Sequence, residues 1–320
     1  MAKTLIIDQK GACLDTERNL LIVSHHSFNR PVSIPFGQIG AIMIGSNVNL
    51  ASTLLTKLAK HGVALTVLPT HHAGQMCRLV GDFGGNVSRR IYQHKLHQDD
   101  DVRRYWATCV VRLKIYRQAK LLGRIADHVG QVSKTPKETI DKLTNTYQHI
   151  TPISLDGLRG IEGSSAQQFF GAYQAFFDDK WGFYARNRRP PKDPINVLLS
   201  LGYTLMTQLY EQSLYAVSLD PFLGVLHDES HGRRSLACDF AEFGRADIEW
   251  WVWQLAHGGE LTLDMFDFGD DKPCVMNKAG RAVFYKSWAK LKPKLQKQAH
   301  RHVHTFLRRL TKTEQKLVFI

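Results

Sequence analysis

The sequence predicts an α+β protein in which a small β-rich N-terminal domain precedes a larger all-α C-terminal domain. The chain has 320 residues, of which 43% are hydrophobic, enough for about two compact domains. Short apolar or alternating runs separated by Gly, Asn and Pro fill roughly the first eighty residues. Beyond Arg89, apolar residues instead recur every three or four positions, which is the period of an amphipathic helix.

The N-terminal segment contains five candidate strands and one helix. The strands are expected at KTLIID (3–8), CLDTERNLLIVSH (13–25), PVSIPF (31–36), IGAIMIG (39–45) and VALTVLP (63–69). One helical face is formed by Leu50, Leu54, Leu55 and Leu58. Asn47 or Asn49 is expected to cap this helix, and Gly62 to end it in the left-handed conformation. The Gly-rich segment GDFGGNVSRR marks the boundary between domains at residues 1–85 and 90–320.

Helical periodicity covers most of the C-terminal domain. We expect helices at residues 103–129, 135–148, 164–177, 194–218, 235–256 and 278–311. The connection YARNRRPPKDP, residues 184–194, cannot be helical through Pro190 and Pro191.

Composition excludes several classes of protein. The N-terminus lacks a secretory signal, and the longest uncharged run, Ile195 to Tyr210, is too short and too polar to span a membrane, so we expect a cytoplasmic protein. Five scattered cysteines without a CxxC pair fit neither a disulfide framework nor a zinc ribbon. The absence of a P-loop, a GxGxxG turn and a GxSxG elbow argues against nucleotide hydrolysis, dinucleotide redox chemistry and serine hydrolysis.

The charge balance indicates a polyanionic partner. The formal net charge is +13 with neutral histidines, an excess typical of proteins that bind nucleic acid. Basic side chains concentrate between Lys286 and Lys316, where Glu314 is the only acid. A solvated helix face and a contact with a DNA backbone explain this run equally well.

Two acids lie in an apolar stretch of the helix expected at 235–256. Asp239 and Glu242 are three residues apart, so a helix presents both carboxylates on one side. Ser235 is expected to cap this helix after a turn at Gly232. A buried carboxylate needs a cation or hydrogen-bond donors. A metal ion is one candidate partner, and the others are Arg233, Arg234 and Arg245.

Two further polar features stand out. Glu162 lies in GIEGSSA, whose small residues allow a backbone or a phosphate to approach closely, although an acid at a helix N-terminus is the plainer interpretation. Asn196, Ser200 and Tyr203 form a polar stripe on an otherwise apolar helix. Such a stripe indicates either an internal hydrogen-bond network or a contact with substrate.

The remaining histidines and tryptophans are weaker candidates. His25 and His26, His71 and His72, and the alternating His300, His302 and His304 have no partner at metal-ligand spacing, which favours surface histidines. Three tryptophans lie on the helix expected at 235–256, and their position on the same helix as Glu242 is more typical of core packing than of base stacking; they are Trp250, Trp251 and Trp253.

Three motifs, in the same order along the chain, resemble the CRISPR-associated integrase and endonuclease family, the first-numbered Cas proteins. LDPFLGVLHDESHGRRSLACDFAEFGR (219–245) resembles that family's signature, GIEG (160–163) its first catalytic segment, and RNRRPPKDPINVLLSLGYTLM (186–206) its proline-rich entry to a central helix. A weaker match is KIYRQAKLL, which begins at Lys114. The family's two-domain layout agrees with the predicted fold class.

The resemblance implies a set of site residues. The family's metal ligands fall on Glu162, His227 and Glu242, with Asp239 as a further acid at the catalytic site. Its other recurrent polar positions match Asn196, Ser200, Tyr203 and Arg245. Two carboxylates and an imidazole suit Mg²⁺ or Mn²⁺ better than structural zinc. Where the family has EEFRP this chain has EFGRA, and Gly244 is expected to loosen the helix after the ligands.

The resemblance also implies a function and partners. Family members insert short foreign DNA (prespacers) into a CRISPR array through attack of a 3′-hydroxyl on a phosphodiester. They act as homodimers joined through the β-rich domains and bridged by the second-numbered Cas protein. Contacts with the double-stranded DNA backbone are then expected from Arg186, Arg188, Arg189, Arg233 and Arg234.

Two alternatives remain open. One is a casposase-type transposon integrase of the same superfamily, which the end of the chain at Ile320 disfavours because such proteins carry extra C-terminal domains. The other is a catalytically silent DNA-binding scaffold, which the intact set of acids disfavours.

Overall fold

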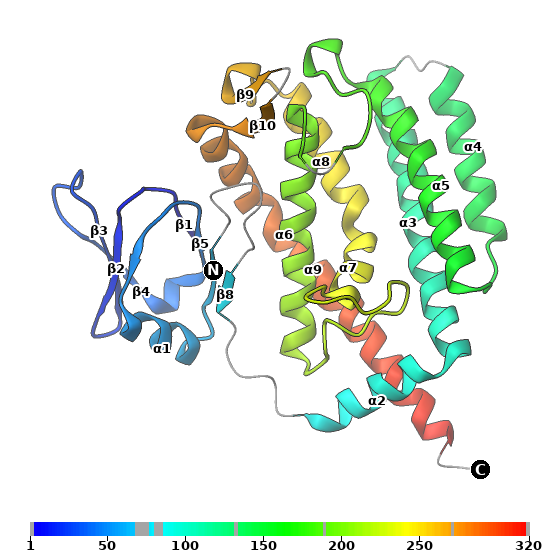
Figure 1. The fold of residues 1–320 in the computed structure, drawn as a ribbon, viewed down its shortest axis with the longest axis horizontal. Coiled ribbons are helices and arrows are strands. Elements are labelled where there is room, and N and C mark those ends of the chain that lie inside the picture. Colours follow the sequence, from blue (N-terminus) through cyan, green and yellow to red (C-terminus); the bar gives the residue numbers. More distant parts are fainter. Residues whose placement is uncertain are drawn as a thin grey trace. The chain divides into compact units, whose positions relative to one another are not determined.

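Two compact units make up the chain, residues 1–83 and residues 84–320. The computed structural model describes residues 3–67, 77–79, 86–130, 134–187, 190–269 and 272–317 (Figure 1). Among these residues, no helix is both long and apolar enough to cross a membrane. The first unit is rich in strands and the second is mostly helical, as the sequence predicts.

Strands and one helix build the first unit. Its elements are β1 (Lys3–Ile7), β2 (Cys13–Glu17), β3 (Leu20–Ser24), β4 (Val32–Pro35), β5 (Ile39–Ile44), β6 (Asn49–Leu50), α1 (Ser52–Lys60), β7 (Ala64–Val67) and β8 (Cys77–Leu79). They form two four-stranded sheets, ordered β1-β5-β7-β8 and β4-β3-β2-β6. Strand β5 pairs in parallel with β1 and β7, and its near-continuous apolar run IGAIMI is typical of a strand covered on both faces.

The core of the first unit joins both sheets and the helix. Leu14 of β2, Ile42 of β5 and Leu54 of α1 belong to one cluster and are at most 1% exposed. Gly62 ends α1 with φ of +64°, as expected. The predicted cap is wrong: Ala51 is the N-cap residue, and Asn49 lies in β6, where its backbone N–H donates to Ala12.

Helices dominate the second unit. They are α2 (Val87–Gln98), α3 (Asp100–Val129), α4 (Lys134–His149), α5 (Leu155–Tyr173), α6 (Pro194–Ala216), α7 (Ser235–Ala241), α8 (Arg245–His257) and α9 (Lys278–Leu317). A short 3-10 turn, η4 (Glu242–Gly244), connects α7 to α8. A hairpin of β9 (Phe266–Gly269) and β10 (Lys272–Met276) also belongs to this unit, so the expectation of an all-α domain was wrong in that detail.

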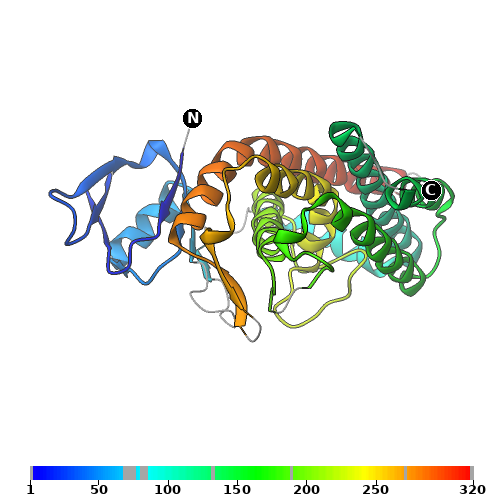
Figure 2. The same ribbon diagram turned by 90° about the horizontal axis from the view of Figure 1, so that it is seen from above.

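The packing of these helices brings distant segments together. Helix α3 packs against α4, α5, α8 and η4, whereas α6 packs against α7, α8 and α9. Figure 1 shows α3, α4 and α5 side by side, and Figure 2 shows α9 running along the length of the unit. Helix α3 therefore touches both segments that carry candidate acids, α5 with Glu162 and η4 with Glu242.

Helix α5 begins earlier than its sequence suggests. The side chain of Ser154 accepts a hydrogen bond from the backbone of Gly157, which starts the helix at Leu155 instead of residue 164. Glu162 is therefore in the interior of a helix, and the interpretation as an N-terminal acid is wrong. The glycines at 160 and 163 hid this extension because glycine is a poor helix former in isolation.

The helix expected at 235–256 is interrupted at η4, which ends at Gly244. A Cβ added to Gly244 would lie 2.1 Å from Cε of Met206 on α6, so a larger residue there would require the methionine side chain to move. Ser235 is the first helical residue, not the cap, and its hydroxyl donates to the carbonyl of Asp228 at 2.9 Å. Gly232 turns the chain before it with φ of +71°.

Candidate active site

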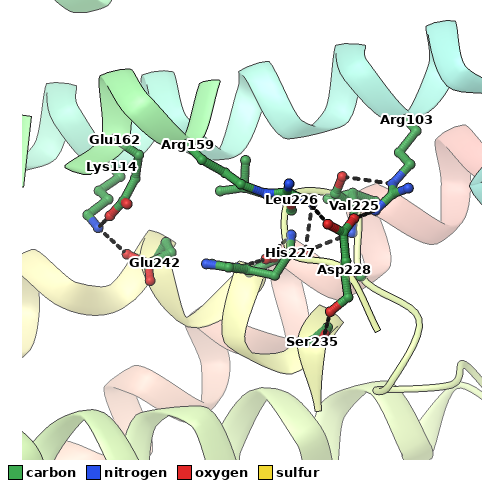
Figure 3. Close-up of polar contacts among 12 residues, drawn as sticks. Arg103, Lys114, Arg159, Glu162, Val225, Leu226, His227, Asp228, Ser235 and Glu242 are labelled. Carbon is green, nitrogen blue, oxygen red and sulfur yellow. Dashed lines mark hydrogen bonds and ion pairs between the residues drawn. The ribbon is translucent and has the colours of Figure 1, made fainter. Parts of the chain in front are cut away.

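A buried lysine joins the two glutamates that the sequence singled out. The Nζ atom of Lys114 on α3 contacts Oε1 of Glu162 and lies 2.7 Å from Oε2 of Glu242 (Figure 3). The side chain of Lys114 is 3% exposed, and those of Glu162 and Glu242 are 20% and 4% exposed. Segments far apart in sequence thus place two carboxylates around one positive charge.

Glu242 has a second cationic partner. The Nε atom of Arg245 lies 2.6 Å from Oε2 of Glu242, the same oxygen that Lys114 contacts. Burial alone would raise the pKa of Glu242, but the charges of Arg245 and Lys114 outweigh it and hold this pKa at about 2. Glu242 is therefore an anion at neutral pH.

Asp239 organises the loop that carries His227. Its Oδ2 accepts hydrogen bonds from the backbone N–H groups of Val225 at 2.7 Å and Leu226 at 2.9 Å. Its Oδ1 accepts from the backbone of His227 at 3.3 Å and lies 2.5 Å from Nδ1 of the same residue. A carboxylate is an acceptor, so Nδ1 carries the imidazole proton and Nε2 stays available as a ligand or base. Asp239 and Glu242 thus have separate partners, despite their spacing.

Arginines from two helices hold the same loop. Arg103 on α3 donates to the carbonyl of Val225 and to Asp228, at 3.2 and 2.7 Å. Arg159 on α5 donates to the carbonyl of Leu226 at 3.0 Å and contacts Asp228 at 2.5 Å. Figure 3 shows the ring of His227 on the side of this loop that faces Glu242. Sequence reasoning missed both arginines because only the folded loop brings their acceptors within reach.

The polar stripe on α6 forms an internal network. Asn196 accepts from Arg186 at 2.6 Å and donates to Asp193 at 2.6 Å, and the hydroxyl of Ser200 accepts from Arg186 at 3.1 Å. Of the two interpretations, the hydrogen-bond network therefore describes these two side chains in this structure. Arg186 itself borders a cavity of about 450 Å³ along α5.

Tyr203, the third member of the stripe, contacts a buried acid. Its hydroxyl donates to Oε1 of Glu249 at 2.7 Å, and Gln118 donates to the same oxygen at 2.9 Å. The guanidinium of Arg245 lies 4.4 Å from the centre of the Tyr203 ring. The network thus continues from Glu242 through Arg245 to Glu249, an acid that no sequence motif indicated.

The remaining candidates differ in their surroundings. Arg233 is exposed, whereas Arg234 is half-buried and pairs with Glu211 at 2.7 Å. Arg188, Arg189, His71 and His72 lie outside the described residues. His302 is not a free surface histidine, because its ring stacks on Tyr210, whose hydroxyl lies 2.7 Å from Nδ1 of His302. Trp251 and Trp253 are buried, as a role in the core predicts.

The donor atoms around Lys114 suit a hard divalent cation. Among the described residues, no three His, Cys, Asp or Glu side chains already have a metal-binding arrangement. Two carboxylates nevertheless converge on one cation, the ammonium of Lys114, and carboxylate oxygens are the ligands that Mg²⁺ and Mn²⁺ prefer. His227 faces them with Nε2 unblocked. The residues therefore fit such a cation in the kind of donor atoms they offer.

Solved structures with this architecture identify the class of fold. A Cas1 protein from Thermotoga maritima superposes with a TM-score of 0.81 at 18% identity, covering 97% of each chain. A casposase bound to an integration product superposes with a TM-score of 0.79 at 18% identity, covering 96% of this chain and 91% of that one. A chain of a Cas6-RT-Cas1–Cas2 complex matches with a TM-score of 0.79 at 20% identity, covering 98% of this chain and 35% of that one. The fold is that of Cas1 and casposase proteins.

Sequence comparison gives the particular family. The model of the family described as CRISPR associated protein Cas1 matches residues 5–290. The CRISPR-associated endonuclease Cas1 1 of Thermodesulfovibrio yellowstonii is 30% identical over 285 residues, which cover 88% of this chain and 89% of the relative. The protein of the same name from Chlorobaculum tepidum is 30% identical over 298 residues, 90% of this chain and 86% of the relative. The chain therefore belongs to the Cas1 family of CRISPR-associated endonucleases.

Proposed function

We propose that this protein is a metal-dependent DNA integrase and endonuclease that inserts prespacers into a CRISPR array. Membership of the Cas1 family supports the reaction class. The observation that carries the proposal is the convergence of Glu162 and Glu242, from α5 and η4, on one buried positive charge. Such a pair of carboxylates binds a hard cation readily.

Three side chains would hold the cation, Mg²⁺ or Mn²⁺. Glu162 and Glu242 would supply carboxylate oxygens, and His227 would supply Nε2. When bound, such a cation polarises a phosphodiester and stabilises charge on its oxygens. Asp239 holds the Nδ1 proton of His227 and thereby fixes the direction of Nε2. Asp239 then acts as a positioning residue rather than as a fourth ligand.

In the reaction, the 3′-hydroxyl of the incoming DNA attacks a phosphodiester of the repeat. A new P–O bond forms as the bond to the old 3′-oxygen breaks, and no side chain becomes covalently attached. His227 can offer only Nε2 to a proton or a cation, since its Nδ1–H is committed to Asp239. Arg233, which is exposed, is suited to hold the DNA backbone together with Arg188 and Arg189.

Asn196 and Ser200 are assigned an indirect role. Both bond to Arg186 at the edge of the cavity along α5, so they position that guanidinium for DNA instead of contacting DNA themselves. Arg245 pairs with Glu242, and the ring of Tyr203 lies against the guanidinium of Arg245, so both residues are assigned to holding Glu242 in place.

The proposed partners follow the neighbours in this family. The protein would act in the cytoplasm as a homodimer joined through its β-rich units. Two such dimers would be bridged by Cas2, which accompanies Cas1 in the complex that one structural neighbour belongs to. Double-stranded DNA, as prespacer and as leader-proximal repeat, is the substrate.

A strand-transfer assay with Mn²⁺ tests the site. Glu162→Gln and Glu242→Gln each remove one carboxylate. We expect joining to fall by about 100-fold or more, because even residues that only support a metal ligand typically change activity by about 10- to 100-fold. The matched control is Glu260→Gln, which alters an exposed acid in the same unit. Joining that survives both substitutions at the control's rate would refute the site, whereas a wild-type protein that binds DNA without joining it would favour the scaffold role.

The choice of DNA separates this proposal from the casposase alternative. The fold is shared with a casposase at 18% identity, so fold alone cannot distinguish them. We expect joining into a leader-repeat target to exceed joining into random plasmid DNA. A preference for donors that carry transposon-end sequences, with no preference for the leader-repeat target, would favour the transposon integrase.

A further inference from the structure

Charge is already balanced around the two glutamates. Glu162 and Glu242 contribute two negative charges, and Lys114 and Arg245 contribute two positive ones, all within direct contact. Lys114 is the member that touches both carboxylates, and its side chain is 3% exposed. Without a buried ammonium at this point, two carboxylates held this close would repel each other.

A divalent cation and the Lys114 ammonium need the same place. A metal ligated by Glu162 and Glu242 must lie between them, where Nζ contacts both. A divalent cation and an ammonium within about 4 Å of each other repel strongly in a partly desolvated site. The two cations are therefore alternatives, not companions.

We propose that Lys114 is a resident counter-cation that a divalent metal displaces. In the metal-free protein the ammonium keeps the two carboxylates together and prevents them from separating. Metal binding moves it away from at least one of them, so Lys114 lowers the apparent metal affinity. This inference rests on the proposed metal site and adds a residue that sets how tightly the site is loaded.

Direct measurement of Mn²⁺ binding, without DNA, tests this role. The protein is the full chain stripped with chelator, and binding is followed by calorimetry or by the electron spin resonance of free Mn²⁺. Lys114→Met keeps most of the side-chain volume and removes the charge. We expect it to bind Mn²⁺ about 10- to 100-fold more tightly than wild type, the usual range for coupling between two sites. Lys120→Met, an exposed position on the same helix, should leave the affinity unchanged.

A second readout covers variants that fold poorly. In chelator, Lys114→Met and Lys114→Gln should unfold at a lower temperature than wild type. Adding Mn²⁺ should raise the unfolding temperature of these variants by more than it raises that of wild type. Mn²⁺ affinity equal to or weaker than that of wild type in both variants would overturn the proposal. So would variants that stay unfolded even in saturating Mn²⁺, because the metal would then not replace the ammonium.

The same titration separates the two proposals. If the Glu162→Gln and Glu242→Gln variants bind Mn²⁺ with the same affinity as wild type, the proposed metal site is wrong. If they weaken binding while the Lys114 variants fail to tighten it, only the role of Lys114 is wrong.

Discussion

At the scale of single residues, Asp239 is a buried carboxylate with a structural role beside the candidate active site. It is fully buried, and its two oxygens accept three backbone N–H groups and face one imidazole. These donors satisfy the charge without a metal. The spacing to Glu242 suggested a shared site, but the carboxylate of Asp239 instead binds the backbone of the loop from Val225 to His227.

Replacing Asp239 should therefore loosen the loop. Asp239→Asn keeps the shape but turns an amide N–H₂ toward donors, so we expect the free energy of unfolding to fall by about 2 to 4 kcal/mol. Urea unfolding followed by circular dichroism measures this. Asp264→Asn, at an exposed site, should change it by less than about 0.5 kcal/mol. Equal effects of the two substitutions would contradict the assignment.

Glu249 is a second buried acid with a different balance. Its side chain is fully buried, and burial raises its pKa despite the hydrogen bonds from Tyr203 and Gln118. The folded protein therefore binds this proton more tightly than the unfolded chain, whose glutamates titrate near 4.5. The stability that Glu249 contributes is fully present below that unfolded value and is lost as pH rises through the raised folded value.

Glu249→Gln should remove this pH dependence. The amide oxygen can still accept from Tyr203 and Gln118, and no charge has to be buried at high pH. We expect the variant to gain stability relative to wild type between pH 4.5 and pH 8, measured as the difference in free energy of unfolding at each pH. A difference that stays constant over this range would show that folding does not raise the pKa of Glu249.

At the scale of elements, two glycines fix how the segments around the site approach one another. A Cβ on Gly224 would lie 2.5 Å from the carbonyl oxygen of His227 and 2.7 Å from Cβ of Ser235. The atoms nearest to a Cβ on Gly244 all belong to the flexible side chain of Met206. Backbone cannot move aside as a methionine can, so the two positions have unequal tolerance.

We expect Gly224→Ala to destabilise the protein by about 3 kcal/mol or more, and Gly244→Ala by about 1 to 2 kcal/mol. Chemical denaturation gives both values. Trimming the obstacle with Met206→Ala should reduce the penalty of Gly244→Ala in a double-mutant cycle. If Gly244→Ala proves the costlier of the two, contact with Met206 is not what makes glycine necessary.

Sequence periodicity predicted most elements and failed where tertiary contacts decide. The strands near Ile42 and the long helix through Lys114 follow their apolar patterns. The start of α5 was missed because the glycines at 160 and 163 mask a helix that Ser154 initiates. The hairpin of β9 and β10 was missed because its strands are short and weakly alternating.

The candidate site divides in the same way. Glu162, His227 and Glu242 could be named from motifs, whereas the roles of Asp239, Arg159 and Lys114 depend on which atoms meet in the folded unit. A carboxylate that binds a loop and one that binds a cation have the same letter in a sequence. Only the distances of 2.7 Å and 2.5 Å to their different partners separate them.

At the scale of the whole molecule, part of the excess positive charge lies on one exposed face of α9. Lys286, Lys290 and Lys297 are exposed on α9, and at about 100° per residue they fall within an arc of about 40° on one helical face. Arg301 is exposed on the same side. An amphipathic helix aligns its exposed charges in this way even without a ligand, but a nucleic-acid backbone would meet all of these charges at once.

Neutralising that face should weaken DNA binding in a salt-dependent way. Each phosphate contact contributes a slope of about −0.9 to log K against log salt on duplex DNA, so replacing Lys286, Lys290 and Lys297 by Gln should reduce the slope by up to about 2.7. The control triple is Lys120, Lys137 and Lys142 to Gln, which removes the same charge from exposed positions on α3 and α4. If both triples flatten the slope equally, the net charge of the protein and not the face of α9 attracts DNA, and the interpretation as a solvated face holds.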